Sequence, residues 1–391
     1  MTGPLSDVTI LDLTSVISGP LATSILADQG ARVIKVESPR GDSMRMAGAI
    51  KDGVSSLFSS INRNKESIAL DLRKPEAIEI IKKIAAKADI CIQNYRPGVV
   101  EKLGIGYDQL KKINPELIYA SISGVGREGP YSGRRVYDPV IQAYAGFASA
   151  QTTNGEPSLV KMMICDKVTS LTMAQAITAA LYDRKNTGKG QHVEVSMLEA
   201  SLYFIWPDRM LDQSFVDKPD LEGSDLTALY KAAPTQDGHI TFMTLQLDEF
   251  HGLARAVGKP EWTEDPRFQE LMSMYAHYSE IFPELLAQIG TWKTAPLVER
   301  LTNEDVPFGV VLDPDNILLD PQVQAHQIIK TFEDSAAGSM RHVNRSSRFS
   351  THDTGIHSPA PRLSEHAKTI LAEFGYSDAD VEPLQSAGVV L

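Results

Sequence analysis

Residues 8–37, VTILDLTSVISGPLATSILADQGARVIKVE, carry the strongest indication of the fold class. Residues 8–13 and 31–37 consist mainly of aliphatic and β-branched residues, which predicts two strands. Between them, Ser18 can cap a helix whose first turn contains a proline, and Gly30 can end that helix in a left-handed conformation. A strand, a helix and a strand within about thirty residues form one crossover, which predicts a parallel sheet.

The same alternation continues along the first half of the chain. Strands are predicted at 67–72, 89–93, 116–123 and 192–196, and helices at 75–88, 107–113 and 166–185. This order predicts an α/β protein with a doubly wound, Rossmann-like parallel sheet. Ligands bind at the carboxyl ends of the strands in such sheets, so the loops 15–19, 94–98 and 123–129 are candidate binding loops. The first turn lacks the GxGxxG motif of a dinucleotide-dependent dehydrogenase.

The second half changes character at a polar segment rich in Asp, Ser, Pro and Gly. We therefore expect a large α/β domain at 1–211, a linker at 212–227, a smaller α+β domain at 228–327 and a C-terminal segment at 328–391 that returns to the large domain. Strands in the smaller domain are predicted at 238–243 and 307–312, and helices at 249–257, 281–289 and 297–303. The C-terminal segment is expected to be an extended connection with a final helix at 366–374.

Charge and composition exclude several classes of function. Among 391 residues, 38 Lys and Arg stand against 50 Asp and Glu, a net charge of −12, so no nucleic-acid partner is expected. No run approaches the roughly 18 apolar residues of a membrane span, and the N-terminus lacks the pattern of a signal peptide. We expect a cytoplasmic protein without a membrane partner. Cys91 and Cys165 have apolar neighbours and are expected to be buried free thiols.

Basic residues gather in the strand-end loops of the first third of the chain. They are Lys35, Arg40, Arg45, Arg63, Lys65, Arg73, Arg96, Lys102, Arg134 and Arg135. Two interpretations stay open. They either form a solvated, salt-bridged surface, or several of them converge and make a phosphate pocket inside an acidic protein.

The placement of histidine limits the possible chemistry. All nine histidines lie at or beyond His192, so the first α/β region lacks the usual general base for neutral pH. No spacing of Cys, His or acidic residues predicts a metal site, and the GxSxG motif of serine hydrolases is missing. We therefore expect no metal, and we expect carboxylates to carry any chemistry in this region.

Asp166 is the best candidate among these carboxylates, because it follows an apolar run and opens the longest predicted helix. It could act only as the N-cap of that helix. It could also be a nucleophile toward an activated acyl group, since helix N-terminal N–H groups stabilise a carboxylate or an oxyanion beside them. Tyr137 and Asp138 follow a glycine-rich loop at 124–133 and form a second candidate pair.

A series of short motifs runs in a fixed order through the chain. They are VTILDL at 8–13 with GP at 19–20, LADQGA at 26–31 with VIKVE at 33–37, NRNK at 62–65 with LDL at 70–72, NYRPG at 94–98, SGVG at 123–126, GPY at 129–131, Asp166, and TGKGQ at 187–191. Weaker matches follow at 265–268, 306–307 and 359–361. In this order they resemble the class III CoA-transferase family, of the formyl-CoA transferase and carnitine CoA-transferase type.

The resemblance implies an exchange of coenzyme A between an acyl-CoA thioester and a free carboxylic acid. Asp166 lies where the family has its nucleophile, so its carboxylate is implied to form a mixed anhydride and then an aspartyl-CoA thioester. This chemistry uses CoA as substrate and product and needs no metal. The family's members form homodimers of interlocked rings, which is implied here as well.

The resemblance also implies a set of residues that contact CoA. They are Ile17, Ser18, Arg40, Leu70, Asp71, Leu72, Arg73, Asn94, Tyr95, Arg96, Lys102, Arg135, Val136, Tyr137 and Asp138. Three of them depart from the family pattern: Ile17 replaces a polar residue of some relatives, Arg40 replaces a basic residue expected near position 38, and Lys102 replaces an Arg. A lysine at position 102 offers a phosphate a point charge rather than a bidentate contact.

Two other functions stay open. Racemases of 2-methylacyl-CoA share the family resemblance, but they carry a His where this chain has Tyr137, and deprotonation beside a thioester needs an acid and a base. A CoA-binding protein without turnover is the other alternative. The glycine-rich flap of oxalate-type transferases is missing at 244–248, so a different acid is expected. The acyl pocket is expected from 203–209 and 241–247, where Phe204 and Trp206 either line it or pack in the core.

Overall fold

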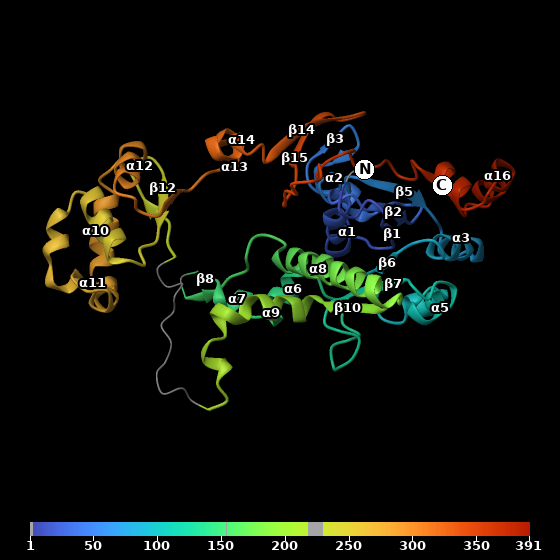
Figure 1. Ribbon diagram of the computed structural model, residues 1–391, viewed down its shortest axis with the longest axis horizontal. Coiled ribbons are helices and arrows are strands. Elements are labelled where there is room, and N and C mark those ends of the chain that lie inside the picture. The colour runs from blue at the N-terminus through green and yellow to red at the C-terminus, as the bar shows by residue number, and fades with distance from the viewer. Residues whose placement is uncertain (1–2, 154, 218–229) are drawn as a thin grey trace. The chain divides into compact units, whose positions relative to one another are not determined.

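The computed structural model describes residues 3–153, 155–217 and 230–391 (Figure 1). The chain forms two compact units: residues up to Val216 join Gln327–Leu391 in the larger unit, and the residues from Asp217 to His326 form the smaller one. The predicted linker at 212–227 begins with a short 3₁₀ turn at Asp212–Ser214, and its residues 218–227 lie outside the described part of the chain.

A six-stranded parallel sheet forms the centre of the larger unit, in the order β10-β7-β6-β1-β2-β5. The strands are β1 (Thr9–Asp12), β2 (Arg32–Glu37), β5 (Lys65–Ala69), β6 (Ile90–Gln93), β7 (Ile118–Ser123) and β10 (His192–Ser196). In the register of the sheet, Ile10 lies between Val33 of β2 and Ile90 of β6. The predicted α/β fold with a parallel sheet is therefore confirmed.

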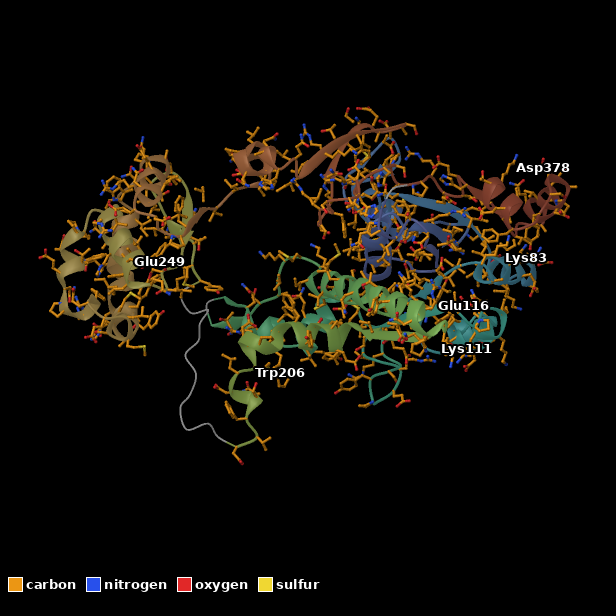
Figure 2. All side chains as sticks on the ribbon, viewed as in Figure 1. Lys83, Lys111, Glu116, Trp206, Glu249 and Asp378 are labelled. Atoms are coloured by element: carbon orange, nitrogen blue, oxygen red, sulfur yellow. The ribbon has the colours of Figure 1, made fainter. Side chains whose placement is uncertain are left out.

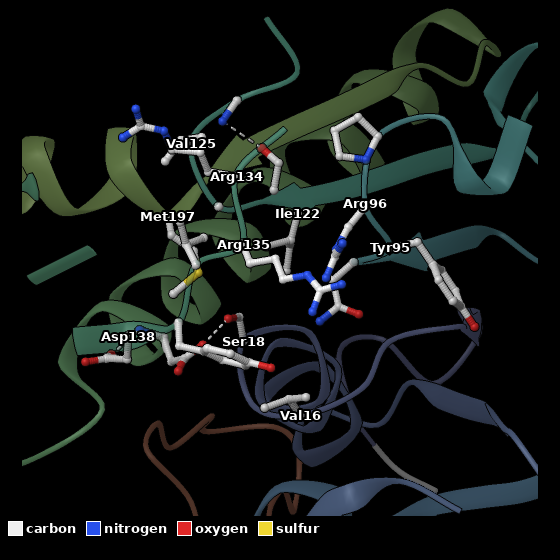
Figure 3. A pocket seen from close by; sticks show the side chains of 18 of the residues that line it. Val16, Ser18, Tyr95, Arg96, Ile122, Val125, Arg134, Arg135, Asp138 and Met197 are labelled. Atoms are coloured by element: carbon white, nitrogen blue, oxygen red, sulfur yellow. Dashed lines mark hydrogen bonds between the residues drawn. The ribbon is translucent and has the colours of Figure 1, made fainter. Parts of the chain in front are cut away.

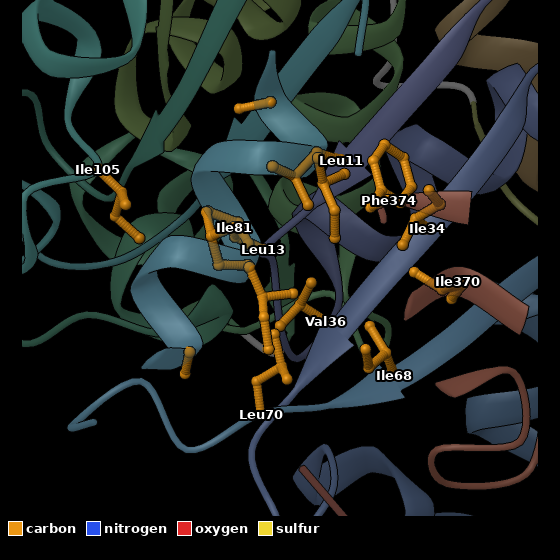
Figure 4. Packing of buried hydrophobic residues seen from close by; sticks show 14 of the residues in the cluster. Leu11, Leu13, Ile34, Val36, Ile68, Leu70, Ile81, Ile105, Ile370 and Phe374 are labelled. Atoms are coloured by element: carbon orange, nitrogen blue, oxygen red, sulfur yellow. The ribbon is translucent and has the colours of Figure 1, made fainter. Parts of the chain in front are cut away.

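Helices cover both faces of this sheet, which explains why its strands read as nearly continuous apolar runs. On one face lie α1 (Ser18–Asp28) and α8 (Ile164–Thr187). On the other lie α3 (Pro75–Ala85), α5 (Tyr107–Ile113), α15 (Ala367–Glu373) and α16 (Asp378–Ser386). Successive strand residues alternate between the faces: Ile10 packs with α1 and α8, whereas Leu11 packs with Ile81 and Ile370 in the core of Figure 4.

The strand order reverses beside β1. The chain runs outward from β1 to β2 and β5, and then returns to β6 on the other side of β1. In doubly wound sheets, ligands bind in the crevice outside the carboxyl ends of the two strands where this reversal occurs. The loops after β1 and β6 flank that crevice.

Shorter elements complete the larger unit. They are η1 (Ser43–Met46), β3 (Ile50–Lys51), β4 (Val54–Ser55), α2 (Ser56–Asn62), α4 (Val99–Leu103), α6 (Asp138–Tyr144), α7 (Phe147–Ala150), β8 (Thr152–Thr153), β9 (Glu156–Pro157), α9 (Met197–Arg209), β14 (Ile329–Asp334) and β15 (Gly338–Val343). A further apolar cluster, which includes Ile141, Cys165 and Met197, joins α6, α8 and α9.

The smaller unit has a three-stranded antiparallel sheet in the order β11-β12-β13. Its elements are β11 (Ala233–Pro234), β12 (His239–Phe242), α10 (Leu247–Ala256), η3 (Pro260–Glu264), η4 (Pro266–Phe268), α11 (Leu271–Ile289), α12 (Thr294–Asn303), β13 (Phe308–Val310), α13 (Pro314–Leu319) and α14 (Pro321–Ala325). Phe250, Phe268 and Leu285 are fully buried in its core.

Sequence patterns fail at three places in the larger unit. The predicted extended connection after residue 328 instead contains the β14–β15 hairpin, whose strands are largely polar and only partly buried. The helix near 366–374 is not the last one, because α16 follows it. The prediction that Ser18 caps α1 is also wrong: Ile17 is the N-cap residue, Ser18 is the first helical residue, and its hydroxyl bonds elsewhere.

Two ammonium–carboxylate pairs are completely buried beside β1. Lys65 Nζ lies 3.1 Å from Asp12 Oδ2, and Lys35 Nζ lies 3.1 Å from Asp42 Oδ2. Lys65 also donates to the carbonyl oxygen of Pro20 at 2.8 Å. Neither lysine is a surface residue, and both ammonium groups are paired inside the protein.

Arg45 and Arg63 likewise form internal ion pairs, with Glu37 at 2.7 Å and with Asp28 at 2.5 Å. Of the basic residues that the sequence grouped together, these four form ion pairs within the fold.

Gly19 lets α1 approach the end of β1. A Cβ atom built on Gly19 would lie 2.3 Å from Cβ of Thr14, far closer than real contacts allow. Thr14 cannot move away, because its backbone N–H donates to Asp12 Oδ1 at 2.9 Å. The start of α1 is therefore fixed against β1 by a contact that only glycine permits.

We predict that Gly19→Ala lowers the free energy of unfolding by about 1–3 kcal/mol, because overpacking outweighs the gain in helix propensity. Urea denaturation of the whole protein measures this change in the free energy of unfolding. Gly133→Ala is the matched control, since a Cβ there meets open space. Equal stability of the two variants would show that α1 tolerates a shift away from Thr14.

Candidate active site

A pocket of about 370 Å³ lies at the crevice where the strand order reverses (Figure 3). Loops after β1, β6 and β7 line it, which are the three loops that the sequence selected. Among the predicted site residues it brings together Ile17, Ser18, Asn94, Tyr95, Arg96, Arg135, Val136, Tyr137, Asp138 and Asp166. Residues that are far apart in the sequence thus surround one cavity.

Asp166 is the third residue of α8, and only 9% of its surface is exposed. The N-cap residue of α8 is Met163, so the interpretation of Asp166 as the N-cap is wrong. The Ser18 hydroxyl donates a hydrogen bond to Asp166 Oδ1. The Asp166 backbone N–H donates to Asp138 Oδ2 at 3.0 Å, so Asp138 satisfies part of the first turn of α8.

Both carboxylate oxygens of Asp138 are engaged. Oδ2 accepts from Asp166, and Oδ1 accepts from Nε2 of Gln142 at 2.6 Å. Gln142 in turn accepts from the backbone N–H of Val160 at 2.9 Å, which ties the segment before α8 to α6. Asp138 is 4% exposed and therefore acts as a fixed support of Asp166.

Burial raises the pKa of Asp166 above its ordinary value, because the charged carboxylate has little water around it. The nearby carboxylate of Asp138 raises it further, whereas the hydrogen bond from Ser18 acts in the opposite direction. The same burial opposes ionisation of Asp12, but Lys65 and Lys35 outweigh it and lower the pKa of Asp12 to about 2. The two buried aspartates are thus in opposite electrostatic environments.

The loop that carries Ser18 is held in a strained conformation. Val16 has a φ of 70°, which is rare for a β-branched residue and costs on the order of 1–3 kcal/mol. Its backbone N–H lies 3.3 Å from both oxygens of Asp42, the partner of buried Lys35. Asn94 binds the same loop through two hydrogen bonds with Ser15, at 2.8 and 3.0 Å.

Two arginines point into the pocket. Figure 3 shows the side chains of Arg96 and Arg135 extending into the same space between Tyr95 and Ser18. Within the described part of the chain neither guanidinium has an ion-pair or hydrogen-bond partner, and both residues are exposed. Two unpaired guanidinium groups facing one cavity form a site for an anion such as a phosphate.

The neighbouring Arg134 is directed differently. It donates to the hydroxyl of Tyr144 at 3.1 Å, and its guanidinium lies 3.9 Å from the ring centre of Tyr131. Figure 3 shows its side chain extending away from Arg135 and Arg96. Arg134 lines the same pocket as Arg135, but its guanidinium is held by Tyr144 and Tyr131.

The remaining predicted contacts lie around a second pocket of about 460 Å³, which Tyr95 shares with the first. Its lining includes the predicted residues Arg40, Leu70, Asp71, Leu72 and Arg73. Hydrogen bonds from Arg73 lower the pKa of Asp71 to about 2. Lys102 is exposed on α4 and lines neither pocket.

Some lining residues were not individually predicted. Val16, Ile122 and Met197 line the first pocket, and Met197 directly follows β10. The rule that ligands bind at strand carboxyl ends would have found Met197, because residues 192–196 were predicted as a strand. Conversely, Phe204 and Trp206 of α9 are 55% and 43% exposed and do not line this pocket. The ring of Phe204 stacks on that of buried Phe147, with 6.1 Å between the ring centres. Trp206 is labelled in Figure 2.

Three further observations concern the residues that the structure describes. Cys91 and Cys165 are buried free thiols, as predicted. No group of three or more His, Cys, Asp or Glu that could hold a metal ion occurs among residues 3–153, 155–217 and 230–391. Within the same ranges no helix is long and apolar enough to cross a membrane.

Comparison with known proteins connects this geometry to a chemistry. The model of CoA-transferase family III matches residues 5–367. Human succinyl-CoA:glutarate CoA-transferase is 32% identical over 394 residues, 99% of this chain and 90% of that protein. Acetyl-CoA:oxalate CoA-transferase from Acetobacter aceti is 33% identical over 383 residues, 96% of this chain and 97% of that protein.

The fold is also similar to a solved structure. The crystal structure of a CAIB/BAIF family protein from Brucella suis has a TM-score of 0.83 and 30% identity, and the match covers 96% of this chain and 100% of that one.

The two buried aspartates give opposite predictions for stability at neutral pH. Ionised Asp166 costs folding free energy because its folded pKa is raised, so Asp166→Asn should unfold at the same or a higher urea concentration than the wild type. Asp12→Asn leaves Lys65 unpaired and should cost about 3–5 kcal/mol.

The pH dependence gives the check on sign. The contribution of Asp12 is complete above its unfolded pKa of 3.8 and is lost as the pH falls toward about 2. The cost of Asp166 is present at neutral pH and disappears as the pH falls through its raised pKa. A destabilised Asp166→Asn variant at neutral pH would contradict this assignment.

Proposed function

Because this chain belongs to CoA-transferase family III, we propose that it moves coenzyme A from an acyl-CoA thioester to a free carboxylic acid through a covalent intermediate on Asp166. The observation that carries the proposal is the position of Asp166. Its buried carboxylate lines the same pocket as the unpaired guanidinium groups of Arg96 and Arg135. A nucleophile and an anion site then lie in one cavity at the ligand-binding edge of the sheet.

The proposed reaction needs only acyl transfers. Asp166 attacks the thioester carbonyl carbon, the C–S bond breaks, and the products are a mixed anhydride and CoA thiolate. The thiolate then attacks the aspartyl carbonyl carbon and releases the first acid as a carboxylate, leaving an aspartyl-CoA thioester. The second acid repeats these steps in reverse. No step needs a proton donor, a metal or a histidine.

The pocket supports this chemistry in two ways. Asp166 has little water to lose before it attacks, because only 9% of its surface is exposed. The supports on α6 and α1 fix its position, because Asp138 holds its backbone and Ser18 holds one carboxylate oxygen.

We assign the CoA molecule to the two pockets joined by Tyr95. Arg96 and Arg135 would bind its phosphates near the first pocket, and Arg40 with residues 70–73 would contact its nucleotide end in the second. Lys102, exposed nearby on α4, would add a point charge. The roles of Ile17, Asn94 and Val136 through Asp138 as further contacts follow the family pattern.

We further propose that the protein acts as a homodimer of interlocked chains, as its family resemblance implies. The large exposed aromatic side chains of α9 support an additional interface, since Tyr203 alone is 85% exposed. An active monomer in solution would contradict this.

The racemase alternative finds little support in the pocket. Tyr137 occupies the position where the racemases carry histidine, and no histidine is among the described residues that line the cavity. Asp138, the neighbouring carboxylate, has both oxygens engaged in hydrogen bonds, with Gln142 and with the backbone N–H of Asp166. A non-catalytic CoA-binding protein would have no use for a buried carboxylate with a raised pKa, because burying it costs stability.

We predict exchange of CoA between an acyl-CoA and isotopically labelled free acids, using succinyl-CoA and acetyl-CoA first because related transferases are named for them. Asp166→Ala should reduce the exchange by at least about a thousandfold, since it removes the nucleophile. Deuterium uptake at the α-carbon without acyl exchange would instead establish a racemase. Binding of acyl-CoA without either activity would leave the non-catalytic alternative.

The proposed phosphate site gives a second prediction. Arg135→Ala should raise the KM for acyl-CoA by about 10–100-fold, because a charge-assisted hydrogen bond is lost. Arg134→Ala, the neighbouring residue held by Tyr144, should change KM little. If both variants had the same KM as the wild type, the phosphates would have to be bound elsewhere.

A further inference from the structure

We propose that the Ser18 hydroxyl is a catalytic group: it makes Oδ2 the attacking oxygen of Asp166 and stabilises the oxyanion that forms on Oδ1. This inference rests on the proposed function and adds to it. The family pattern implied only that Ser18 contacts CoA, whereas the structure places its hydroxyl on the reacting carboxylate.

The two oxygens of Asp166 are not equivalent. Oδ1 accepts the hydrogen bond from the Ser18 hydroxyl, and the Ser18 backbone N–H also faces this carboxylate, whereas no side chain among the described residues donates to Oδ2. Ser18 is 5% exposed and Asp166 is 9% exposed, so little water competes for this hydrogen bond. The oxygen that is free to attack a thioester is therefore Oδ2.

The position of Ser18 is fixed from both sides. The hydroxyl of Ser170 on α8 lies 2.7 Å from the carbonyl oxygens of both Ser18 and Asp166, so it ties the first turns of α1 and α8 together. On the other side, Gly19 packs against Thr14, and Val16 is bound to Asp42. Because neither helix can shift freely, the Ser18 hydroxyl is preorganised toward Asp166.

The reaction makes use of this arrangement when sulfur attacks the aspartyl carbon. In the mixed anhydride, Oδ2 bridges Cγ and the acyl group, and Oδ1 is the carbonyl oxygen. The CoA sulfur forms a bond to Cγ, and the carbonyl electron pair moves to Oδ1. When that pair returns, the Cγ–Oδ2 bond breaks and Oδ2 leaves with the released carboxylate. Ser18 keeps its proton throughout and donates most strongly to the charged Oδ1.

This donation also selects between the two carbonyl carbons of the anhydride. Attack of the thiolate on the acyl carbon gives an acyl-CoA thioester, and attack on Cγ gives the aspartyl-CoA thioester. Ser18 polarises the aspartyl carbonyl, so it lowers the barrier at Cγ both when the aspartyl-CoA thioester forms and when the second acid attacks it.

The test compares Ser18→Ala with Ser24→Ala. Ser24 is a matched control, because it is fully buried in the same helix and its hydroxyl has no hydrogen-bond partner in the described structure. With the acyl-CoA that exchanges fastest in the wild type, Ser18→Ala should lower kcat by about 10²–10³-fold and leave KM nearly unchanged. Ser24→Ala should change neither constant.

A pH profile separates this role from a structural one. Removing the Ser18 hydroxyl removes a hydrogen bond that lowers the pKa of Asp166, so the acid limb of kcat/KM should move to higher pH in Ser18→Ala. Ser18→Thr keeps the hydroxyl and should keep the wild-type profile. Thermal melts of the three variants show whether each one folds. If Ser18→Ala does not fold, Ser18→Gly takes its place and is compared with Ser18→Thr.

Two different failures can be distinguished. If the wild type exchanges CoA but Ser18→Ala retains its kcat and pH profile, the inference about Ser18 is wrong and the proposed function stands. If the wild type exchanges no acyl-CoA tested, the proposed function and this inference are both wrong.

Discussion

Two buried ammonium groups beside the first strand hold the site in place. Lys65 donates to Asp12, to the Pro20 carbonyl oxygen and to Asn62 Oδ1, so its three protons are all used. Lys35 joins Asp42 to the carbonyl oxygen of Thr14. Burying such charges is expensive, and burial lowers the pKa of Lys65 to about 8 despite its carboxylate partner. Their contribution is therefore geometric: they fix the short segment between β1 and α1 in one conformation.

The conformation of that segment determines where the Ser18 hydroxyl lies relative to Asp166. Asp42 binds the backbone of Val16, which has an unfavourable conformation. Ile17 then caps α1, and Ser18 begins the helix with its hydroxyl directed at Asp166. On the opposite side, Asp138 supports the backbone of Asp166 from α6. The carboxylate of Asp166, the proposed nucleophile, is thus held between two elements at the carboxyl edge of the sheet, in an environment that disfavours its charge. The ionised Asp166 lowers the stability of the folded protein, and it is the residue that the proposed chemistry requires to be reactive.

Local sequence signals explain most of the larger unit. The helix at Tyr107–Ile113 and the strand at His192–Ser196 have the predicted bounds, because their residue pattern and flanking turns agree with their environment. Predictions are wrong where a contact between residues far apart in the sequence determines the local structure. Lys65 belongs to a strand only because Asp12 neutralises it, and Ser18 meets a partner 148 residues away instead of capping its own helix. The β14–β15 hairpin was missed for another reason, because its partly exposed strands have few apolar residues.

The proposed mechanism requires CoA to become covalently attached to Asp166, and the mass of the intact protein measures this attachment. After brief mixing with an acyl-CoA and acid quenching, we expect a fraction of the protein to be heavier by the mass of CoA less one water, because one oxygen of Asp166 leaves with the released acid. Proteolysis should locate that addition on the peptide containing Asp166, and Asp166→Ala should lack it. Steady CoA exchange with no such adduct, or an adduct on a different residue, would contradict the account.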